Sequence, residues 1–225
     1  NKMNSITMAI IFMLFIGFFI FQIIKKFLLN NLDKSINKKD YALTVTLSDM
    51  SLARRFLGDY TCDLYKAKAY YLDKNVDKFD EMLEHIISTE YKNPEDKKSF
   101  LLLYYHTFIL KENKKYTDLI LNELKKYSDE NFIKYNQQAY EVMINKRNDL
   151  IEEMDNQIDS KKFYGFSLGV ILYMIAIQYE RIGDLKHAFT YFRDCIVCFS
   201  PNEKYVALAK KKIAELERNI IMVEE

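Results

Sequence analysis

Residues Ile6–Ile24 read ITMAIIFMLFIGFFIFQII, a run of 19 residues without a charge. At 1.5 Å per residue such a helix spans roughly 28 Å, which is close to the thickness of the hydrocarbon core of a bilayer. The run is apolar on every side, as lipid exposure requires, whereas a helix at the surface of a soluble domain keeps a polar face. We therefore expect a membrane-spanning helix here.

Two other interpretations of this run are a cleaved signal peptide and a buried helix of a soluble domain. A signal peptide needs a basic start, a shorter apolar run and a cleavage site of small residues. Only Lys2 precedes the run, and the segment FQIIKKFLL closes and follows it without an A-x-A pattern. A buried helix of this length would normally keep one polar face. The sequence favours a single-pass signal anchor over both alternatives.

The charges that flank the run predict its orientation. The lysines that follow it within about 15 residues are Lys25, Lys26, Lys34, Lys38 and Lys39, against Lys2 before it. Because positively charged flanks stay on the cytoplasmic side, we expect a single-pass membrane protein whose C-terminal domain is cytoplasmic. Lys25 and Lys26 directly flank the membrane; they either only fix the topology or also contact anionic headgroups of the lipid bilayer.

Composition limits the fold classes that the remaining chain can adopt. Gly occurs 5 times and Pro twice in 225 residues. All-β domains and phosphate-binding loops need glycine at turns and at close backbone approaches, so an all-α fold is favoured. Residues 1–39 carry six Lys and one Asp, and the other 186 residues carry a net charge of about −4. A near-neutral to acidic domain argues against nucleic acid as a partner.

Helical patterns after Lys39 come in pairs that are separated by short turns. The turns fall near Asn75, Asn113, Arg147 and Gly183, at spacings of about 38, 34 and 36 residues. A break near Lys39 extends the series by about 36 residues toward the N-terminus. A helix–turn–helix unit of this period is typical of a helical solenoid, because one helix pair cannot bury both of its apolar faces alone.

The last pair resembles a tetratricopeptide repeat. Its large and small residues have the spacing of that family's signature, with Pro201 near the terminal proline: Leu172, Ala176, Tyr179, Gly183, Ala188, Phe192 and Cys195. A second copy, 109 residues earlier, matches in part through Ala67, Tyr70, Lys74, Val76, Phe79, Leu83 and Ile86. It departs from the pattern where Lys74 replaces the turn glycine and Phe79 replaces the small alanine. The two copies between them match more weakly.

The resemblance implies a right-handed solenoid of antiparallel helix pairs, which we expect to follow the transmembrane helix in an all-α chain. We expect an anchor with its basic flank over residues 1–30, repeats over residues 31–200, and a C-terminal capping helix over residues 201–225. Apolar residues recur at helical spacing in this last segment, as a cap with a polar outer face requires. They are Tyr205, Leu208, Ala209, Ile213, Leu216 and Ile220.

The family binds an extended peptide or a partner helix in a groove lined by the first helix of each pair. In this sequence the equivalent positions are Val170, Tyr173, Ile177, Glu180 and Arg181 in the last copy, and Thr61, Leu64, Lys68, Tyr71 and Leu72 in the second. As the partner-binding groove we select Lys68, Tyr71, Tyr173, Ile177, Glu180 and Arg181, since Tyr and Arg are good anchors. The alternative is that these residues pack against a neighbouring repeat. The set lacks the basic clamp that a terminal carboxylate would require.

No enzyme motif is found, and we expect neither a catalytic site, nor a metal, nor a cofactor. Cys195 and Cys198 have the spacing of metal and redox sites, but no second such pair exists, and core packing explains Cys195 better. The histidines, His85, His106 and His187, are expected to be surface or partly buried residues. The sequence predicts a membrane-anchored scaffold or adaptor for a partner protein, or alternatively a structural subunit of a larger membrane complex without a free groove.

Overall fold

The structure, a computed structural model, describes residues 5–127 and 129–224. In this part of the chain every regular element is a helix, and there are twelve of them. The predicted all-α fold is therefore confirmed for the described residues. The chain divides into two compact units, residues 1–100 and 101–225, and the boundary falls inside α6 (Pro94–Ile109).

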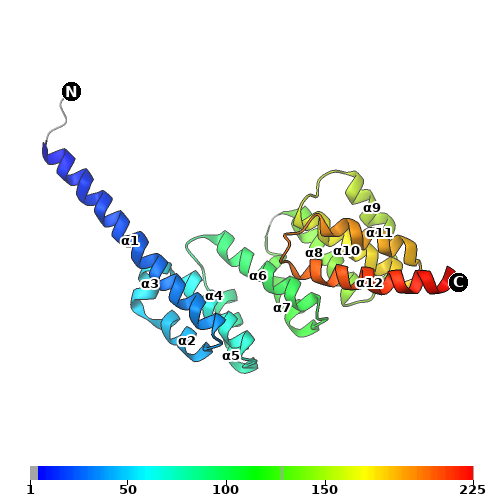
Figure 1. Cartoon of the computed structure of the whole chain (residues 1–225), viewed down its shortest axis with the longest axis horizontal. Helices are drawn as coiled ribbons and strands as arrows, with labels where there is room; N and C mark the ends of the chain where they lie inside the picture. Colours follow the sequence, from blue (N-terminus) through cyan, green and yellow to red (C-terminus); the bar gives the residue numbers. More distant parts are fainter. Residues whose placement is uncertain (1–4, 128, 225) are drawn as a thin grey trace. The chain divides into compact units, whose positions relative to one another are not determined.

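Unit 1 is built from five helices and the start of α6 (Figure 1). They are α1 (Ser5–Asn37), α2 (Tyr41–Asp49), α3 (Ser51–Leu57), α4 (Asp59–Leu72) and α5 (Val76–Ser88). Helix α1 packs against α2 and α3, and α4 packs against α2, α3 and α5. The short α2 and α3 are thus held between the long first helix and the α4–α5 pair.

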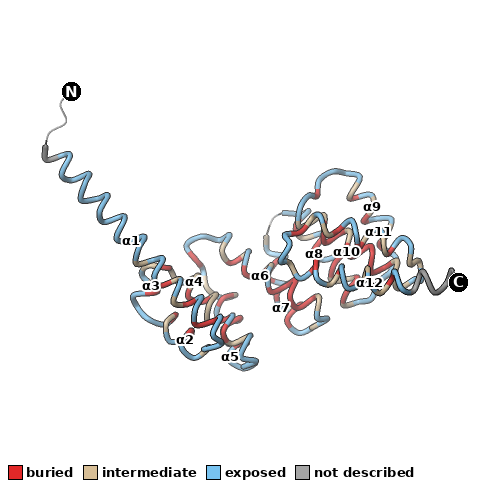
Figure 2. Tube along the Cα trace, viewed as in Figure 1, coloured by how far each residue is buried: buried red, intermediate tan, exposed pale blue. Residues whose placement is uncertain are grey.

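Helix α1 has two parts with different surroundings. It is long and apolar enough to cross a membrane, and residues 7–23 are exposed along its first part (Figure 2). Lys25 and Lys26 follow, both exposed. From Leu28 onward one face of the same helix is buried. The helix continues without a break through residue 30, where the sequence placed the end of the anchor, and stops at Asn37.

The buried face of α1 forms the core of unit 1. Leu28 and Leu32 lie in one cluster with Ala53, Leu57 and Cys62 of α3 and α4. The residues of α1 are four apart and therefore lie on one face of the helix. Because these side chains are removed from water only while α1 stays docked, the second part of the helix is a structural element of the unit.

Unit 2 consists of the rest of α6 and six further helices. They are α7 (Lys114–Leu124), α8 (Glu130–Met143), α9 (Ile151–Asp159), α10 (Phe166–Arg181), α11 (Leu185–Ile196) and α12 (Lys204–Glu224). Helix α10 packs against α8, α9, α11 and α12. It is therefore the central helix of the unit, which explains why it is apolar nearly all round.

One turn geometry recurs at the ends of the helices. Eight of the described residues have a positive φ. Gly58, Lys161 and Gly165 stand apart, and the other five form a series with φ between 54° and 85°: Lys39, Lys74, Glu112, Lys146 and Gly183. Successive positions are 35, 38, 34 and 37 residues apart. This left-handed conformation ends a helix and lets the chain reverse. The turns therefore fall where the sequence predicted them.

Four of these turns share their hydrogen bonds as well. The residue after the left-handed one donates its N–H to the carbonyl five residues earlier: Asp40 to Ser35, Asn75 to Tyr70, Asn113 to Phe108 and Asp184 to Tyr179, at 2.9–3.0 Å. The same Asp or Asn then accepts, through its side chain, the N–H three residues later and caps the next helix. The turn after α8 is the exception, because Arg147 donates to Glu141 instead and no Asx cap follows directly.

Single substitutions at two of these turns test how strongly the left-handed conformation restricts the choice of residue there. Gly183 has φ +85° and no atom near an added Cβ, so Gly183→Ala should cost about 1 kcal/mol of unfolding free energy through backbone strain alone. Lys74 adopts φ 59° with a side chain, so Lys74→Gly should be neutral or stabilising. Urea unfolding of the full chain in detergent measures both. Equal destabilisation by the two changes would contradict this account of the turns.

Candidate functional site

The predicted groove residues of α10 are all engaged within unit 2. Tyr173 and Ile177 are buried, and the ring of Tyr173 lies 4.9 Å from that of Tyr205 on α12. Glu180 forms an ion pair of 2.8 Å with Lys212, also on α12. The C-terminal helix thus contacts two of the residues at which the sequence placed the groove.

Arg181 is the remaining predicted residue on this helix. Its guanidinium donates a hydrogen bond of 2.5 Å to the backbone carbonyl of Val142 at the end of α8. Burial lowers the pKa of Arg181 below its ordinary value, although nearby Glu112 and Glu180 act in the opposite direction. The side chain of Arg181 satisfies a carbonyl at the end of a helix, so it links α10 to α8.

The two predicted groove residues of α4 belong to unit 1. Lys68 is exposed, and Tyr71 is half-buried with its ring 5.5 Å from that of Phe79. Phe79 is the residue that departs from the small alanine of the family pattern, and the contact shows what the larger side chain packs against. The structure therefore leaves the α4 positions more accessible than those of α10.

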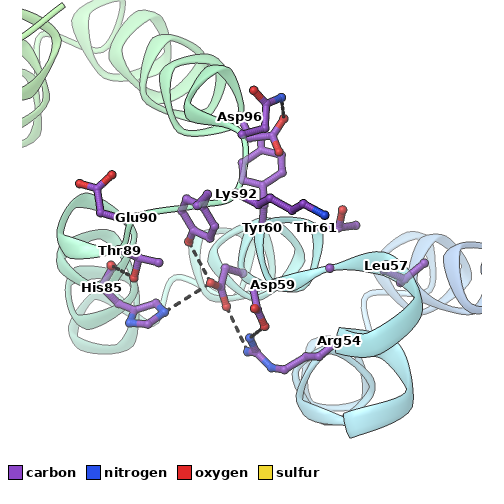
Figure 3. A pocket seen from close by; sticks show the side chains of 14 residues that line it. Arg54, Leu57, Asp59, Tyr60, Thr61, His85, Thr89, Glu90, Lys92 and Asp96 are labelled. Atoms are coloured by element: carbon purple, nitrogen blue, oxygen red, sulfur yellow. Dashed lines mark hydrogen bonds and ion pairs between the residues drawn. The ribbon is translucent and has the colours of Figure 1, made fainter.

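A cleft of about 730 Å³ lies in unit 1, where α3, α4 and the segment after α5 meet (Figure 3). Its acidic lining residues are Asp59, Asp63, Glu90 and Asp96, and its permanently charged cations are Arg54 and Lys92. Thr61, one of the family's groove positions, also lines it. The cleft is therefore more acidic than basic.

Asp63 is the buried centre of this cleft. Its carboxylate accepts hydrogen bonds from the hydroxyl of Tyr91, at 2.8 Å, and from Nη2 of Arg54, at 3.0 Å. Nε2 of His85 lies 3.3 Å from the same carboxylate. Arg54 and His85 approach from different helices, as Figure 3 shows. One side chain thus joins α3, α4, α5 and the loop that follows, because a buried carboxylate must find partners from every side.

We call Asp63 and its partners Arg54, Tyr91 and His85 the Asp63 hub. The contacts within it shift the pKa values of groups in the cleft. Burial alone would lower the pKa of Arg54, but hydrogen bonds with Asp59 and Asp63 raise it above its ordinary value. Burial and the bond to Asp63 raise the pKa of Tyr91 well beyond physiological pH. Both groups therefore keep their protons. They hold the carboxylate in place and are poorly suited to proton transfer at neutral pH.

A second buried hub lies in unit 2, around His106. Nδ1 of His106 lies 2.7 Å from the hydroxyl of Tyr205, and Nε2 lies 3.0 Å from the side-chain oxygen of Asn136. An amide oxygen only accepts, so Nε2 carries the proton and Nδ1 accepts from the tyrosine. Burial lowers the pKa of His106 to about 3. The sequence predicted a surface or partly buried histidine here, and the structure corrects this, because α6, α8 and α12 enclose the ring.

The three cysteines lie in the described part of the chain and differ in burial. All three thiols are free, and no group of three or more His, Cys, Asp or Glu side chains that could hold a metal ion occurs in that part of the chain. Burial raises the pKa of Cys62 to about 11 and that of Cys195 to about 12. Thiols that stay protonated at neutral pH are poor nucleophiles and ligands.

No family model, no curated protein and no solved structure matches this chain.

The Asp63 hub predicts that two aspartates on α4 contribute very differently to the free energy of unfolding. Asp63 and Asp59 both bond to Arg54, but their side chains are 2% and 69% exposed. Asp63→Asn should cost about 2–4 kcal/mol of unfolding free energy, because it removes the charge that balances a partly buried guanidinium. Asp59→Asn should cost less than about 1 kcal/mol, as exposed ion pairs do. Urea titration compares them, and similar losses would refute the hub.

The His106 hub predicts a pH-dependent stability. The folded-state pKa of His106 is about 3, below the value near 6.5 of an exposed histidine. Its contribution is therefore complete above pH 6.5 and is lost as the pH falls from 6.5 toward 3. Between pH 7.5 and 5, the wild type should lose about 2 kcal/mol more unfolding free energy than His106→Gln.

The control for this comparison is built into the chain, because His85 and His187 are present in both proteins. Urea unfolding of the full chain in detergent at the two pH values gives the difference. A wild type and a variant with the same pH dependence would show that the imidazole is not buried as a neutral group.

Proposed function

We propose that this protein is a membrane-anchored adaptor whose tetratricopeptide-like helical repeats hold a partner protein at the membrane surface. Helix α1 supports the anchor, since it is long and apolar enough to cross a bilayer and its first part is exposed. The recurring turns support a solenoid of antiparallel helix pairs, because a left-handed conformation returns at intervals of 34 to 38 residues. Four of these five turns also share the same backbone hydrogen bond. The lysines after the apolar run support a cytoplasmic C-terminal part.

The partner surface that we favour is the cleft of unit 1 together with the accessible face of α4. This choice rests on one observation: Thr61 lines an open cleft while Tyr173 is covered by α12. Asp59 and Asp63 are already paired with Arg54, which leaves Glu90 and Asp96 as the lining carboxylates that suit a partner segment with Lys or Arg. Anchoring such a site in a membrane raises the effective concentration of the partner there.

The second candidate function is a structural subunit of a larger membrane complex. The covering of α10 by α12 favours it, since a groove filled by the chain's own helix offers no free peptide site. Exposed apolar side chains of unit 2 would then be subunit contacts, and Tyr164 and Val197 are 82% and 86% exposed. The two candidates therefore place the partner on different residues.

Site-specific photocrosslinking in native membranes separates the two candidates. A photoreactive residue is introduced at Thr61, at Val197, or at the exposed control position Glu84 on α5. The adaptor function predicts a discrete protein adduct from Thr61 and none from Glu84. Reversing the charge of the cleft with Glu90→Lys and Asp96→Lys should reduce that adduct at least about tenfold, because like charges then face the partner.

An abundant adduct from Val197 alone would favour the structural subunit. Equal adducts from Thr61 and Glu84, or an adduct that survives the charge reversal, would rule out the cleft as the partner site. Protease added to the outside of intact cells or organelles tests the orientation separately, since digestion of the C-terminal part would contradict it.

A further inference from the structure

The length of α1 leaves no spacer between the proposed membrane span and the fold of unit 1. From Ser5 to Ile24 the helix has 20 residues and a length of about 30 Å, which the hydrocarbon core requires in full. Ile24 is already half-buried against the core cluster, and Leu28 is buried in it. The folded unit therefore begins where the bilayer ends.

Helix α3 reaches a residue that belongs to the apolar segment itself. The rings of Phe21 on α1 and Phe56 on α3 are stacked, with centroids 5.1 Å apart. Phe21 precedes Ile24 by three residues, or about 4.5 Å along the helix axis. Wherever the first part of α1 is surrounded by lipid, the side chain of Phe56 must lie at the boundary between headgroups and acyl chains.

The residues of α3 are of the types found at the boundary between lipid headgroups and acyl chains. Leu52 lies four residues before Phe56, so the two side chains occupy the same face of the helix. Leu52 is 45% exposed, and Met50, directly before the helix, is 42% exposed. Arg55 is exposed on the same short helix. Apolar side chains beside a cation are typical of helices that lie in the interface plane of a membrane.

Lysines on α1 surround this region with further positive charge. Lys25 and Lys26 follow Ile24 directly, and both are exposed. Near an anionic membrane surface such cations contact lipid headgroups. Through the contact of Phe56 with Phe21, the apolar side chains of α3 adjoin the exposed apolar surface of α1. This continuity selects lipid, rather than a protein, as the occupant of the surface.

We propose that α3 is an interfacial helix that seats unit 1 on the bilayer, with Leu52 and Phe56 at the acyl boundary and Arg55, Lys25 and Lys26 at the headgroups. This inference rests on the proposed membrane anchor. It adds that the fold itself binds lipid and stands directly on the membrane surface.

Tryptophan fluorescence tests the proposal, because the chain contains no Trp and each Trp variant is a single reporter. The full-length protein is reconstituted in phosphatidylcholine–phosphatidylserine vesicles, with and without lipids brominated near the headgroup end of the acyl chains. Leu52→Trp reports on α3. Leu72→Trp is the matched control, since Leu72 is 41% exposed at the opposite end of α4. Ile16→Trp, at a position 42% exposed within the apolar segment, reports on the anchor.

An interfacial helix buries its apolar face about 5–10 Å deep, so brominated lipid should quench Leu52→Trp at least about twice as strongly as Leu72→Trp. Aqueous acrylamide should show the reverse order. Equal lipid quenching at the two positions, or a Leu52→Trp that neither quencher reaches, would overturn the interfacial helix. Ile16→Trp tests the anchor independently of α3. If brominated lipid quenches Ile16→Trp, the proposed anchor stands whatever the result for Leu52→Trp. An unquenched Ile16→Trp would overturn the anchor and the seating together. Circular dichroism of each variant confirms that the helices are retained.

Discussion

The docking of Leu28 and Leu32 of α1 onto α3 and α4 is the contact on which unit 1 depends. The same helix carries an apolar segment that is exposed over residues 7–23 and, further on, a face that belongs to the core of the unit. Neither part can move without the other, because a continuous helix transmits rotation along its axis. A flexible linker, by contrast, limits how far a domain can move from the membrane but does not fix its orientation.

The two units hold their helices together with buried polar hubs of different chemistry. Asp63 in unit 1 is charged, and it is stabilised by a guanidinium, a phenol and an imidazole from separate segments. His106 in unit 2 is neutral and links Tyr205 and Asn136 through one donor and one acceptor. A charged hub fixes its partners by electrostatics, while a neutral hub fixes them by the direction of its hydrogen bonds. Both make the arrangement of helices specific in a way that apolar packing alone does not.

The features that the sequence predicted correctly are those that depend on residues close together along the chain. The apolar run of α1, the helix pairs and the turns follow from short-range signals, and Asn75, Asn113 and Asp184 cap their helices where those signals place them. Contacts between distant residues had no such signal. The burial of His106 depends on Tyr205, 99 residues away, and the covering of Tyr173 depends on how α12 packs onto α10. The open cleft of unit 1 was missed for the same reason, since Arg54, Asp63 and Tyr91 come from three segments that only folding brings together.

The unbroken course of α1 from exposed segment to core has a mechanical consequence. A membrane-spanning helix responds to a mismatch between its apolar length and the bilayer thickness by tilting. A helix that ended in a flexible linker would absorb that tilt, but α1 ends inside unit 1 and would swing the unit with it. With α1 in a bilayer as proposed, membrane thickness would set the angle at which the unit faces the surrounding solution. Lipid composition would then act on the orientation of the domain without any ligand.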